Sequence, residues 1–593
     1  MSVLIGYAWS ILMDALLINI FRKKFEEVMP LAYITGGFCL FLFGLFEHIS
    51  YGYYFSLILC VISFLWILYL YIKDKEGFKA FLQRFFTIGF VAFTVMFLFI
   101  FFLQRNRGFS IADEFWNWGL QVREDFRLDS FISEESRYAN RAYPPFLTII
   151  ELLFCYFGGA FQEGYCYRGL TTFCLSLYLP LLGCFDIRKK KDWIRTLIYV
   201  LVFFLLGICI SVTVTDGDYP HIYNTIYVDF PMGLFSAYCF YQVYTQKRWE
   251  VFTLVNTVLS ITVLLLLKQT GMAFAAMVIV FLIFLVIRDS QEKKKIDKKK
   301  LFLTIGLIIG IPLLVYGGWS VYAYLQGNSA NTLDMLSSEK VRNFFLYLTD
   351  PTQEKHQVIL NYVDVFLHRP LVLQPLSFSF FTYSIFISVI LFLILFFLYR
   401  DKASAFALSL IYYLGSLAYA AARIFLFLTI YNEHQGTYFV SYDRYMKSYL
   451  YIGTILAFML VMKKMAEEQE NKKAALKTAA VLLCTCLFVE PANLNELVPS
   501  DKYTGYNNER MGWILNMLES TEEGSRFFFV EQYIFDQGRQ DVLDYVLLDS
   551  SYDVDVYTLG PDTWDGQQSM DISVEEYLEL LKNYDYLFLI YPD

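Results

Sequence analysis

Long apolar runs recur along this chain of 593 residues. About fourteen of them reach roughly the length that a helix needs to cross a bilayer. They cover residues 2–20, 29–47, 52–72, 85–103, 166–184, 192–213, 224–244, 250–267, 271–287, 301–323, 378–399, 404–429, 447–462 and 475–491. Hydrophobic residues make up 57% of the chain and its mean hydropathy is +0.45, which excludes an ordinary soluble domain. Because a backbone in lipid satisfies its hydrogen bonds within helices, the runs predict an all-α polytopic membrane protein.

Basic residues between the runs predict how the chain is oriented. Clusters of lysine and arginine stand at residues 22–24, 73–84, 188–191, 247–248, 293–300, 400–402 and 463–477. The positive-inside rule places these clusters in the cytoplasm. All of them fit on that side only if a further apolar segment, 143–160, does not cross fully, and the prolines at its start favour a juxtamembrane or re-entrant segment. We therefore expect a multi-pass plasma-membrane protein with about fourteen crossings and both termini outside the cell. The first run has no basic region before it and is expected to be a retained span.

This orientation predicts three parts of the chain. They are N-terminal transmembrane helices over 1–84, a transmembrane core over 85–491 with external loops 104–142 and 324–377, and an extracytoplasmic domain over 492–593. In the last part the apolar runs shrink to strand length. The net charge of −9 gives no indication of a nucleic-acid partner. The apolar runs make the lipid bilayer the expected partner.

The tail over 492–593 alternates between helical and extended patterns. Helices are expected near 510–519 and 574–582, and strands near 526–530, 553–559 and 584–591. Alternating helices and strands predict a small α/β domain with a parallel sheet.

Two adjacent carboxylates, Asp113 and Glu114, stand just beyond the apolar run 85–103, and Trp116 and Trp118 follow them. A carboxylate at the membrane surface can act as a general base that removes a proton from an acceptor hydroxyl. It can alternatively ligate a divalent cation such as Mg²⁺ or Mn²⁺, because such cations prefer oxygen ligands. The tryptophans can bind a substrate or anchor the segment at the interface. The segment alone leaves these alternatives open.

Two charged residues at the outer ends of later runs are further candidates. Asp229 lies a few residues inside the outer end of its run, and a carboxylate inside an apolar helix indicates a functional site. Lys268 lies between two runs on the side opposite to the basic clusters, where it can neutralise a phosphate group. The alternatives are a shallow carboxylate that reaches water and a lysine that snorkels to the interface.

Two arginines complete the set. Arg444, followed by Tyr445, stands at the outer mouth of a run, and its guanidinium suits bidentate recognition of phosphate. An ion pair with Asp443 or Glu433 is the alternative. Arg168 stands at the head of its run and can pair with the adjacent carboxylates described above or with a phosphate.

Taken in order along the chain, these residues resemble the motifs of the GT-C superfamily of polyprenyl-phosphate-dependent membrane glycosyltransferases, which includes protein O-mannosyltransferases and lipid A aminoarabinose transferases. The resemblance spans roughly residues 85–460. Its motifs are Asp113-Glu114, Tyr143-Pro144-Pro145, Arg168, Tyr227 with Asp229, Lys268 with Gly271, and Arg444-Tyr445. The chain departs from the pattern in the runs over 1–84, since many members begin with the run that meets the acidic loop.

The resemblance implies a GT-C-like core and an inverting transfer of a hexose or pentose from a polyprenyl-phosphate-linked donor. The acceptor would be a cell-envelope glycan, lipid or protein on the outer face of a bacterial membrane. Asp113 is then the expected catalytic base, with Glu114 beside it, while Lys268, Arg444 and Arg168 would face the lipid phosphate. The family pattern does not fix whether a metal takes part.

Two other function classes remain open. A flippase or other transporter for lipid-linked oligosaccharides predicts polar residues near the middle of several spans and symmetry between halves. An O-antigen-type polymerase or ligase would depend mainly on arginines in the external loop 324–377.

Overall fold

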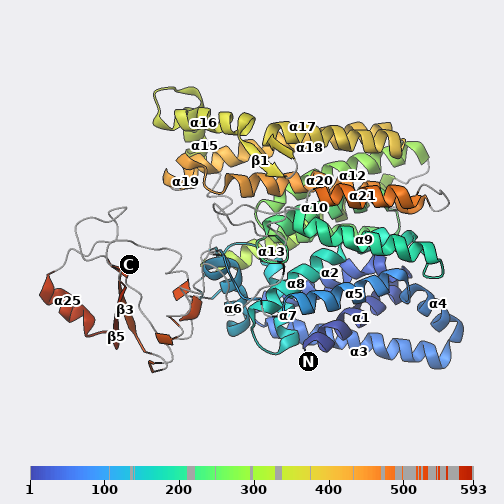
Figure 1. Cartoon of the computed structure of the whole chain (residues 1–593), viewed down its shortest axis with the longest axis horizontal. Helices are drawn as coiled ribbons and strands as arrows, with labels where there is room; N and C mark the ends of the chain where they lie inside the picture. Colours follow the sequence, from blue (N-terminus) through green and yellow to red (C-terminus); the bar gives the residue numbers. More distant parts are fainter. Residues whose placement is uncertain are drawn as a thin grey trace. The chain divides into compact units, whose positions relative to one another are not determined.

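The computed structural model is mostly helical (Figure 1). It describes residues 2–105, 107–111, 113–133, 136, 138, 140–209, 221–246, 249–293, 298–327, 337–373, 376–431, 433–468 and 474–487, and, nearer the C-terminus, 497, 514, 516–517, 520–522, 525–531, 542–543, 545–547, 556–557 and 573–590. The chain forms two compact units. The first consists of Met1–Arg105, Val122–Ser136 and Asn140–Val498, and the second of Asn106–Gln121, Arg137–Ala139 and Pro499–Asp593. The second unit therefore contains most of the tail and also part of the external loop 104–142.

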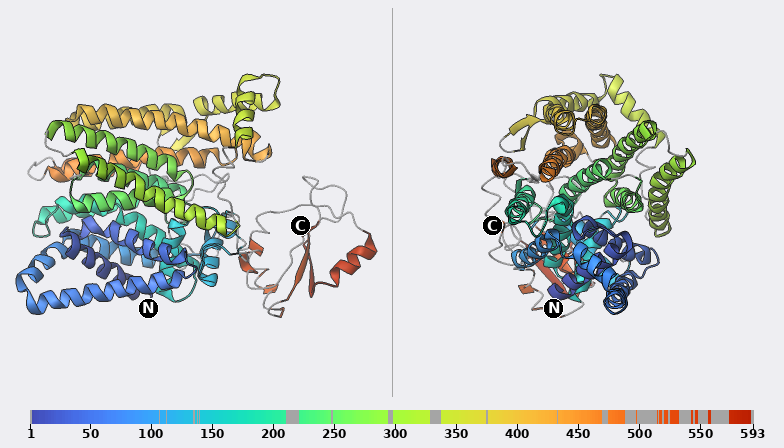
Figure 2. Two further views of the ribbon diagram at one scale, coloured as in Figure 1. Left: turned by 180° about the vertical axis from the view of Figure 1, so that it is seen from behind. Right: turned by 90° about the vertical axis from the view of Figure 1, so that its right-hand side faces the viewer.

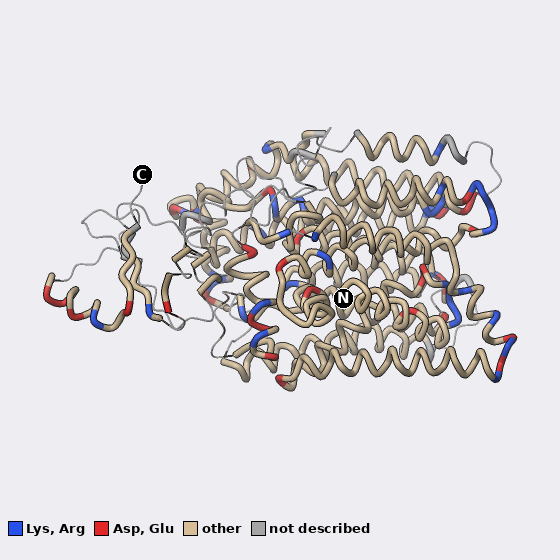
Figure 3. Tube along the Cα trace, turned by 60° about the horizontal axis from the view of Figure 1, so that its bottom comes forward, with Lys and Arg blue, Asp and Glu red and all other residues tan. Residues whose placement is uncertain are grey.

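Eight helices of the described chain are long and apolar enough to cross a membrane. They are α1 (Ser2–Phe21), α2 (Phe25–Gly44), α3 (Ile49–Lys73), α12 (Gly271–Lys293), α13 (Lys298–Leu325), α17 (Phe380–Leu393) with its continuation η3 (Ile394–Leu398), α18 (Lys402–Thr429) and α20 (Tyr442–Glu467). A ninth span results if α4 (Lys75–Phe85) and α5 (Ile88–Leu103) count as one. This is the construction of a multi-pass membrane protein, as the apolar runs predict. Charged residues gather toward the ends of the first unit, and the stretches between them carry few charges (Figure 3).

The other apolar runs also form helices, most of which are shorter, although α9 has 20 residues. They are α8 (Glu163–Ser176), η2 (Leu179–Cys184), α9 (Lys190–Cys209), α10 (Asp229–Thr245), α11 (Val251–Leu267) and α21 (Ala474–Leu487). The run 166–184, expected to be one helix, breaks between α8 and η2, where Pro180 occupies the first turn of the 3-10 helix. The segment 143–160 forms α7 (Phe146–Gly158), a buried helix of 13 residues. At ~20 Å it is shorter than the bilayer core, and Gly159 ends it in the left-handed conformation.

Residues 88–103 of the run 85–103 form the single helix α5, and α4, which precedes it, meets it at an angle of 55°. The bend lies at Phe86 and Thr87, at the start of the run. Thr87 caps the new helix by accepting the backbone N–H of Phe90 at 3.3 Å, and its hydroxyl donates to the buried Glu26. A threonine in the N-cap position starts a helix, so the run forms a helix of its own, separate from α4.

Helix α10 lies inside the first unit, where it packs against α20, α11 and α12 (Figure 2). The contact with α20 is close because Gly233 faces it. A Cβ at Gly233 would lie 2.8 Å from Cβ of Tyr451 and 2.9 Å from the carbonyl oxygen of Ser448. This close approach sets the N-terminal ends of α10 and α20 beside each other.

The loop 324–377, which the basic clusters predict to be external, carries two helices, α15 (Ser338–Thr349) and α16 (Glu354–His368), followed by an antiparallel hairpin of β1 (Pro370–Leu373) and β2 (Leu376–Ser379). Both helices pack against α18, and α16 also packs against α17. Two further short helices lie in loops: α6 (Gly119–Leu128) and α19 (Glu433–Tyr438).

In the second unit, β3 (Phe527–Glu531) pairs in parallel with β4 (Val556–Tyr557) on one side and β5 (Tyr586–Ile590) on the other. Helix α25 (Val574–Leu581) leads into β5, and Ser573 and Glu576 form a capping box at its start. The parallel sheet predicted from the alternating pattern is thus confirmed. The helix expected at 510–519 lies mostly outside the described residues.

Candidate functional site

Four of the predicted substrate-binding residues come together at one end of α10, α11 and α20. Asp229 is the first residue of α10, and Lys268 directly follows the last residue of α11. Arg444 and Tyr445 lie in the first turn of α20. Because α11 and α20 both pack against α10, residues that are far apart in the sequence come together at one place.

Asp229 is the centre of this group and is only 3% exposed. Its Oδ1 lies 3.9 Å from Nζ of Lys268, and its Oδ2 lies 3.8 Å from Nε of Arg444. The hydroxyl of Ser448 donates to Oδ1 at 3.1 Å. A buried carboxylate is stable only when it is paired and hydrogen-bonded, and these contacts meet that requirement. Asp229 therefore orients both cations.

A third cation, Arg423 from α18, belongs to the same group and was missed in the sequence analysis. Its guanidinium lies 4.0 Å from the ring centroid of Tyr445 and donates to the hydroxyl of Tyr419 at 3.0 and 3.2 Å. Arg423 is buried. The signal was available in the sequence, since an arginine inside the apolar run 404–429 is an intramembrane charge, and such charges mark functional sites.

Tyr445 connects the three cations. Its ring centroid lies 5.5 Å from Nζ of Lys268 and 5.0 Å from the guanidinium of Arg444, and its hydroxyl accepts a hydrogen bond from Arg444 at 3.1 Å. We refer to Asp229, Lys268, Arg423, Arg444 and Tyr445 as the Asp229 cluster. Cation–π contacts of this kind hold cations in place while leaving their N–H groups able to bind an anion.

Further aromatic rings surround the cluster. The Tyr227 ring lies 5.1 Å from the guanidinium of Arg444, and the Tyr143 ring lies 5.9 Å from Nζ of Lys268. Tyr431 stacks on Tyr445 with ring centroids 6.4 Å apart. Burial raises the pKa of Tyr431 above its ordinary value, so its hydroxyl stays a neutral hydrogen-bond donor. Tyr143 and Tyr227 belong to two of the motifs, Tyr143-Pro144-Pro145 and Tyr227 with Asp229.

The cluster suits an anion that carries more than one negative charge. Its described side chains comprise three cations and one carboxylate, all of them buried. The N-termini of α10 and α20 also lie here, and neither N-cap residue, Val228 or Ser441, makes a side-chain cap hydrogen bond. Helix N-termini supply N–H groups and a positive partial charge that favour phosphate. A phosphate group is therefore the ligand that the geometry fits best.

Arg168 has different neighbours. It donates to the carbonyl of Phe101 at 3.3 Å, and its guanidinium lies 4.8 Å from the Phe101 ring and 5.4 Å from the Tyr165 ring. None of these contacts is shared with the Asp229 cluster. The structure thus brings together Asp229, Lys268, Arg444 and Tyr445, whereas Arg168 stands on its own.

The acidic pair lies in the second unit, on a single π-helical turn, η1 (Glu114–Trp118). Glu114 is fully buried, and its Oε2 accepts the backbone N–H groups of Ser110 at 2.8 Å and Ile111 at 3.2 Å. Asp113 is half-buried, and its Oδ1 accepts the indole N–H of Trp116 at 3.2 Å. The two carboxylates therefore have different surroundings: Glu114 stabilises its own turn, while Asp113 is accessible and oriented by Trp116.

Aromatic packing holds this turn within the second unit. The ring of Tyr545 lies 5.6 Å from that of Phe109 and 5.2 Å from that of Phe115. Trp118, which was expected to bind substrate, is buried. Trp116 is more exposed and keeps its contact with Asp113.

Within the part of the chain that the structure describes, no group of three or more histidine, cysteine, aspartate or glutamate side chains could hold a metal ion. A scan against protein-family models and a search of the curated proteins both find no match for this chain.

Proposed function

We propose that this protein is an inverting glycosyltransferase that moves a sugar from a polyprenyl-phosphate carrier to a cell-envelope acceptor. The observation that carries the proposal is the Asp229 cluster, in which Lys268, Arg423 and Arg444 surround one carboxylate at the end of a helix bundle. A lipid phosphate is an anion that reaches such a place from within the membrane. The resemblance of the ordered motifs to GT-C glycosyltransferases supplies the reaction.

The proposal places the reaction on the outer face of the membrane. Arg444 begins α20 and Lys463, in one of the basic clusters, lies near its end. A rise of about 1.5 Å per residue puts these two residues roughly 28 Å apart, close to the thickness of a bilayer core. With the basic clusters in the cytoplasm, the Asp229 cluster faces outward. The same orientation puts the C-terminal α/β domain and both termini outside, with about fourteen crossings.

Each residue of the site then has a role. The cations bind the carrier phosphate and neutralise the charge that develops on it as the bond between the anomeric carbon and the phosphate oxygen breaks. The acceptor oxygen attacks the anomeric carbon from the opposite face and loses its proton to a general base, the role that the resemblance to GT-C enzymes gives to Asp113. Trp116 orients Asp113, and Glu114 keeps a structural role in the turn.

One observation favours a second candidate, a transporter of lipid-linked sugars. Asp14 lies in the middle of α1 and is fully buried. Neither of its carboxylate oxygens has a hydrogen-bond partner among the described residues. A polar group at mid-span is what a transport pathway requires.

An assay with reconstituted vesicles distinguishes the two candidates. The full chain is supplied with a panel of polyprenyl-phosphate hexoses and pentoses and with a cell-envelope fraction as acceptor. A new glycosidic bond with equimolar release of polyprenyl phosphate supports the glycosyltransferase. Movement of the donor across the bilayer without a new bond supports the transporter and contradicts the first proposal.

A further inference from the structure

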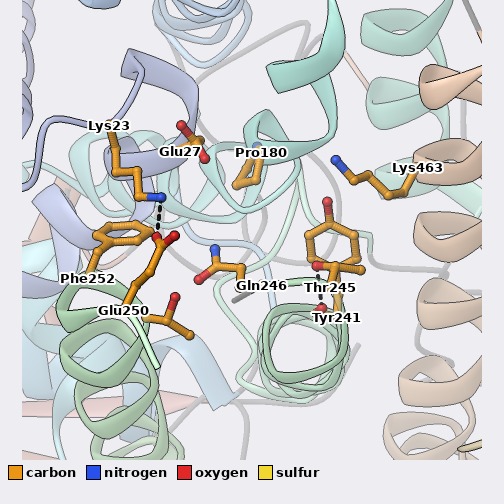
Figure 4. A pocket seen from close by; sticks show the side chains of 10 residues that line it. Lys23, Glu27, Pro180, Tyr241, Thr245, Gln246, Glu250, Phe252 and Lys463 are labelled. Carbon is orange, nitrogen blue, oxygen red and sulfur yellow. Dashed lines mark hydrogen bonds and ion pairs between the residues drawn. The ribbon is translucent and has the colours of Figure 1, made fainter. Parts of the chain in front are cut away.

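A polar cavity of about 280 Å³ lies in the first unit, at the end of α10, α11 and α20 that is remote from the Asp229 cluster (Figure 4). Tyr241 lies in the last turns of α10, Glu250 precedes α11, and Lys463 lies near the end of α20. At ~30 Å³ for each water molecule, the volume equals roughly nine waters. The cavity can therefore hold a small polar group, and the proposed glycosyl transfer makes no use of it.

Two lysines face the cavity from different sides, and Gln246 and Tyr241 lie between them (Figure 4). Nζ of Lys23 lies 2.5 Å from Oε2 of Glu250, a strong ion pair. Nζ of Lys463 lies 3.2 Å from Sγ of Cys184 and 3.8 Å from Glu467, a half-exposed residue one turn further along α20. The charge of Lys23 is thus neutralised within the wall, while Lys463, which also lines the cavity, has a longer ion pair with the half-exposed Glu467.

Further polar groups line the same space. Oε1 of Gln246 is buried without a hydrogen-bond partner among the described residues. Rotation of the amide presents its NH₂ group instead, so Gln246 can serve as donor or acceptor. The first turn of α11 also borders the cavity through Phe252 and Thr253, and its N-cap makes no side-chain cap hydrogen bond. Its N–H groups add donors for an anion.

Glu27 is a second carboxylate in the lining of the cavity, besides Glu250, which is paired with Lys23. Glu27 accepts the backbone N–H of Lys24 at 3.0 Å through Oε2, and it lines the cavity together with Lys463. Among the described residues that line the cavity, Lys463 and Glu27 are the cation and the carboxylate that remain once the Lys23–Glu250 pair is set aside. A purely anionic ligand would be repelled by Glu27, and a purely cationic ligand would be repelled by Lys463.

We propose that this cavity binds a zwitterionic group in which an amine is linked to a phosphate. The phosphate contacts Lys463 and Tyr241, and the amine contacts Glu27. Such a group occurs in phosphatidylethanolamine headgroups and in soluble aminoalkyl phosphates, and both present the same chemistry. A site at this end of the spans faces the leaflet on the side of the basic clusters, independently of any sugar transfer at the other end.

The test measures binding to the purified full-length protein in detergent, with phosphatidylethanolamine, phosphatidylcholine, phosphatidic acid and soluble O-phosphoethanolamine as probes. Phosphatidylethanolamine is expected to bind at least tenfold more tightly than phosphatidylcholine, whose trimethylated amine cannot donate to Glu27. Lys463→Gln should weaken phosphatidylethanolamine binding about tenfold, because one charge-assisted contact is lost. Lys464→Gln, on the neighbouring residue outside the cavity, is the matched control and should leave the affinity unchanged.

Glu27→Gln tests the amine contact by itself, and glutamine at this position still suits the capping of α2. It should remove the preference for phosphatidylethanolamine over phosphatidic acid. Binding of O-phosphoethanolamine without the lipid would support the site with a soluble ligand. Equal binding of all probes, or unchanged affinity in both Lys463→Gln and Glu27→Gln, would overturn the proposal, and the melting temperature of each variant verifies that it is folded.

Discussion

Arg444 and Asp229 are paired across the contact between α20 and α10, with Nε of the arginine 3.8 Å from Oδ2 of the carboxylate. The pair depends on how closely the two helices approach. Gly233, one turn along α10 from Asp229, faces Tyr451 and the backbone of Ser448 in α20. The helix contact and the cation cluster are therefore parts of one arrangement.

Gly233→Ala should separate these helices. Its new Cβ would lie 2.8 Å from Cβ of Tyr451 and 2.9 Å from the Ser448 carbonyl oxygen, so one helix has to move. Overpacking of this kind lowers the free energy of unfolding by about 1–3 kcal/mol. Thermal unfolding in detergent measures the loss. Gly310→Ala is the control, because a Cβ there meets no atom within 4 Å, and an equal loss in both variants would contradict the explanation.

Asp229→Asn should destabilise the protein strongly, because it leaves Lys268 and Arg444 without the carboxylate that orients them. Breaking a buried pair by removing one partner lowers the free energy of unfolding by about 3–5 kcal/mol. Ser448→Ala removes only the hydrogen bond to Asp229 and should lower it by about 1 kcal/mol. Both values come from unfolding in denaturant. Equal stability of wild type and Asp229→Asn would show that the carboxylate does not hold the cluster together.

The two carboxylates of the acidic loop should respond differently to loss of charge. Asp113→Asn is expected to lower sugar transfer by about 10²–10⁴-fold at unchanged melting temperature, because the proposed base is removed. Glu114→Gln is expected to lower the melting temperature, because two backbone N–H groups lose an ionised acceptor. Transfer rates and melting curves are measured on the same preparations. Full transfer by folded Asp113→Asn would remove Asp113 from the reaction.

Asp125 in α6 predicts a dependence of stability on pH. It is buried, and neither carboxylate oxygen has a hydrogen-bond partner among the described residues. Burial and the nearby Glu124 raise the pKa of Asp125 well above its ordinary value. The folded protein therefore binds this proton more tightly than the unfolded chain, and the stability that Asp125 contributes at low pH is lost as the pH rises. Asp125→Asn, which stays neutral, should raise the melting temperature at pH 7.5 and have little effect near pH 4. An increase that is the same at both pH values would contradict the assignment.

Much of the fold follows from the sequence because apolar length alone decides where a chain can cross lipid. Helix boundaries at and within the runs follow from single residues. Thr87 starts α5 after the bend that follows α4, and Pro180 lies in the first turn of a separate 3-10 helix. Hydropathy does not register such residues, since they interrupt the helix without changing the apolar character of the run.

The candidate site could be predicted in part. Asp229, Lys268 and Arg444 are conspicuous as charges at the ends of apolar runs, and the structure brings them together. Arg423 was not predicted, although it is a charge within an apolar run, because that run was interpreted only as a membrane span. The division of the chain into two units, with Asp113 in the second, depends on aromatic contacts such as that of Phe115 with Tyr545, which no local pattern reveals.

The most direct test of the proposed function is the affinity of the purified full-length protein for polyprenyl phosphate, the part of the donor common to every sugar. Lys268→Met and Arg444→Met should each weaken binding at least tenfold, because each removes a charge-assisted contact with the phosphate. Lys340→Met, in helix α15 of the loop 324–377, is the matched control and should bind as the wild type does. Unchanged affinity in folded Lys268→Met and Arg444→Met would contradict the assignment of the Asp229 cluster as the site of the lipid phosphate.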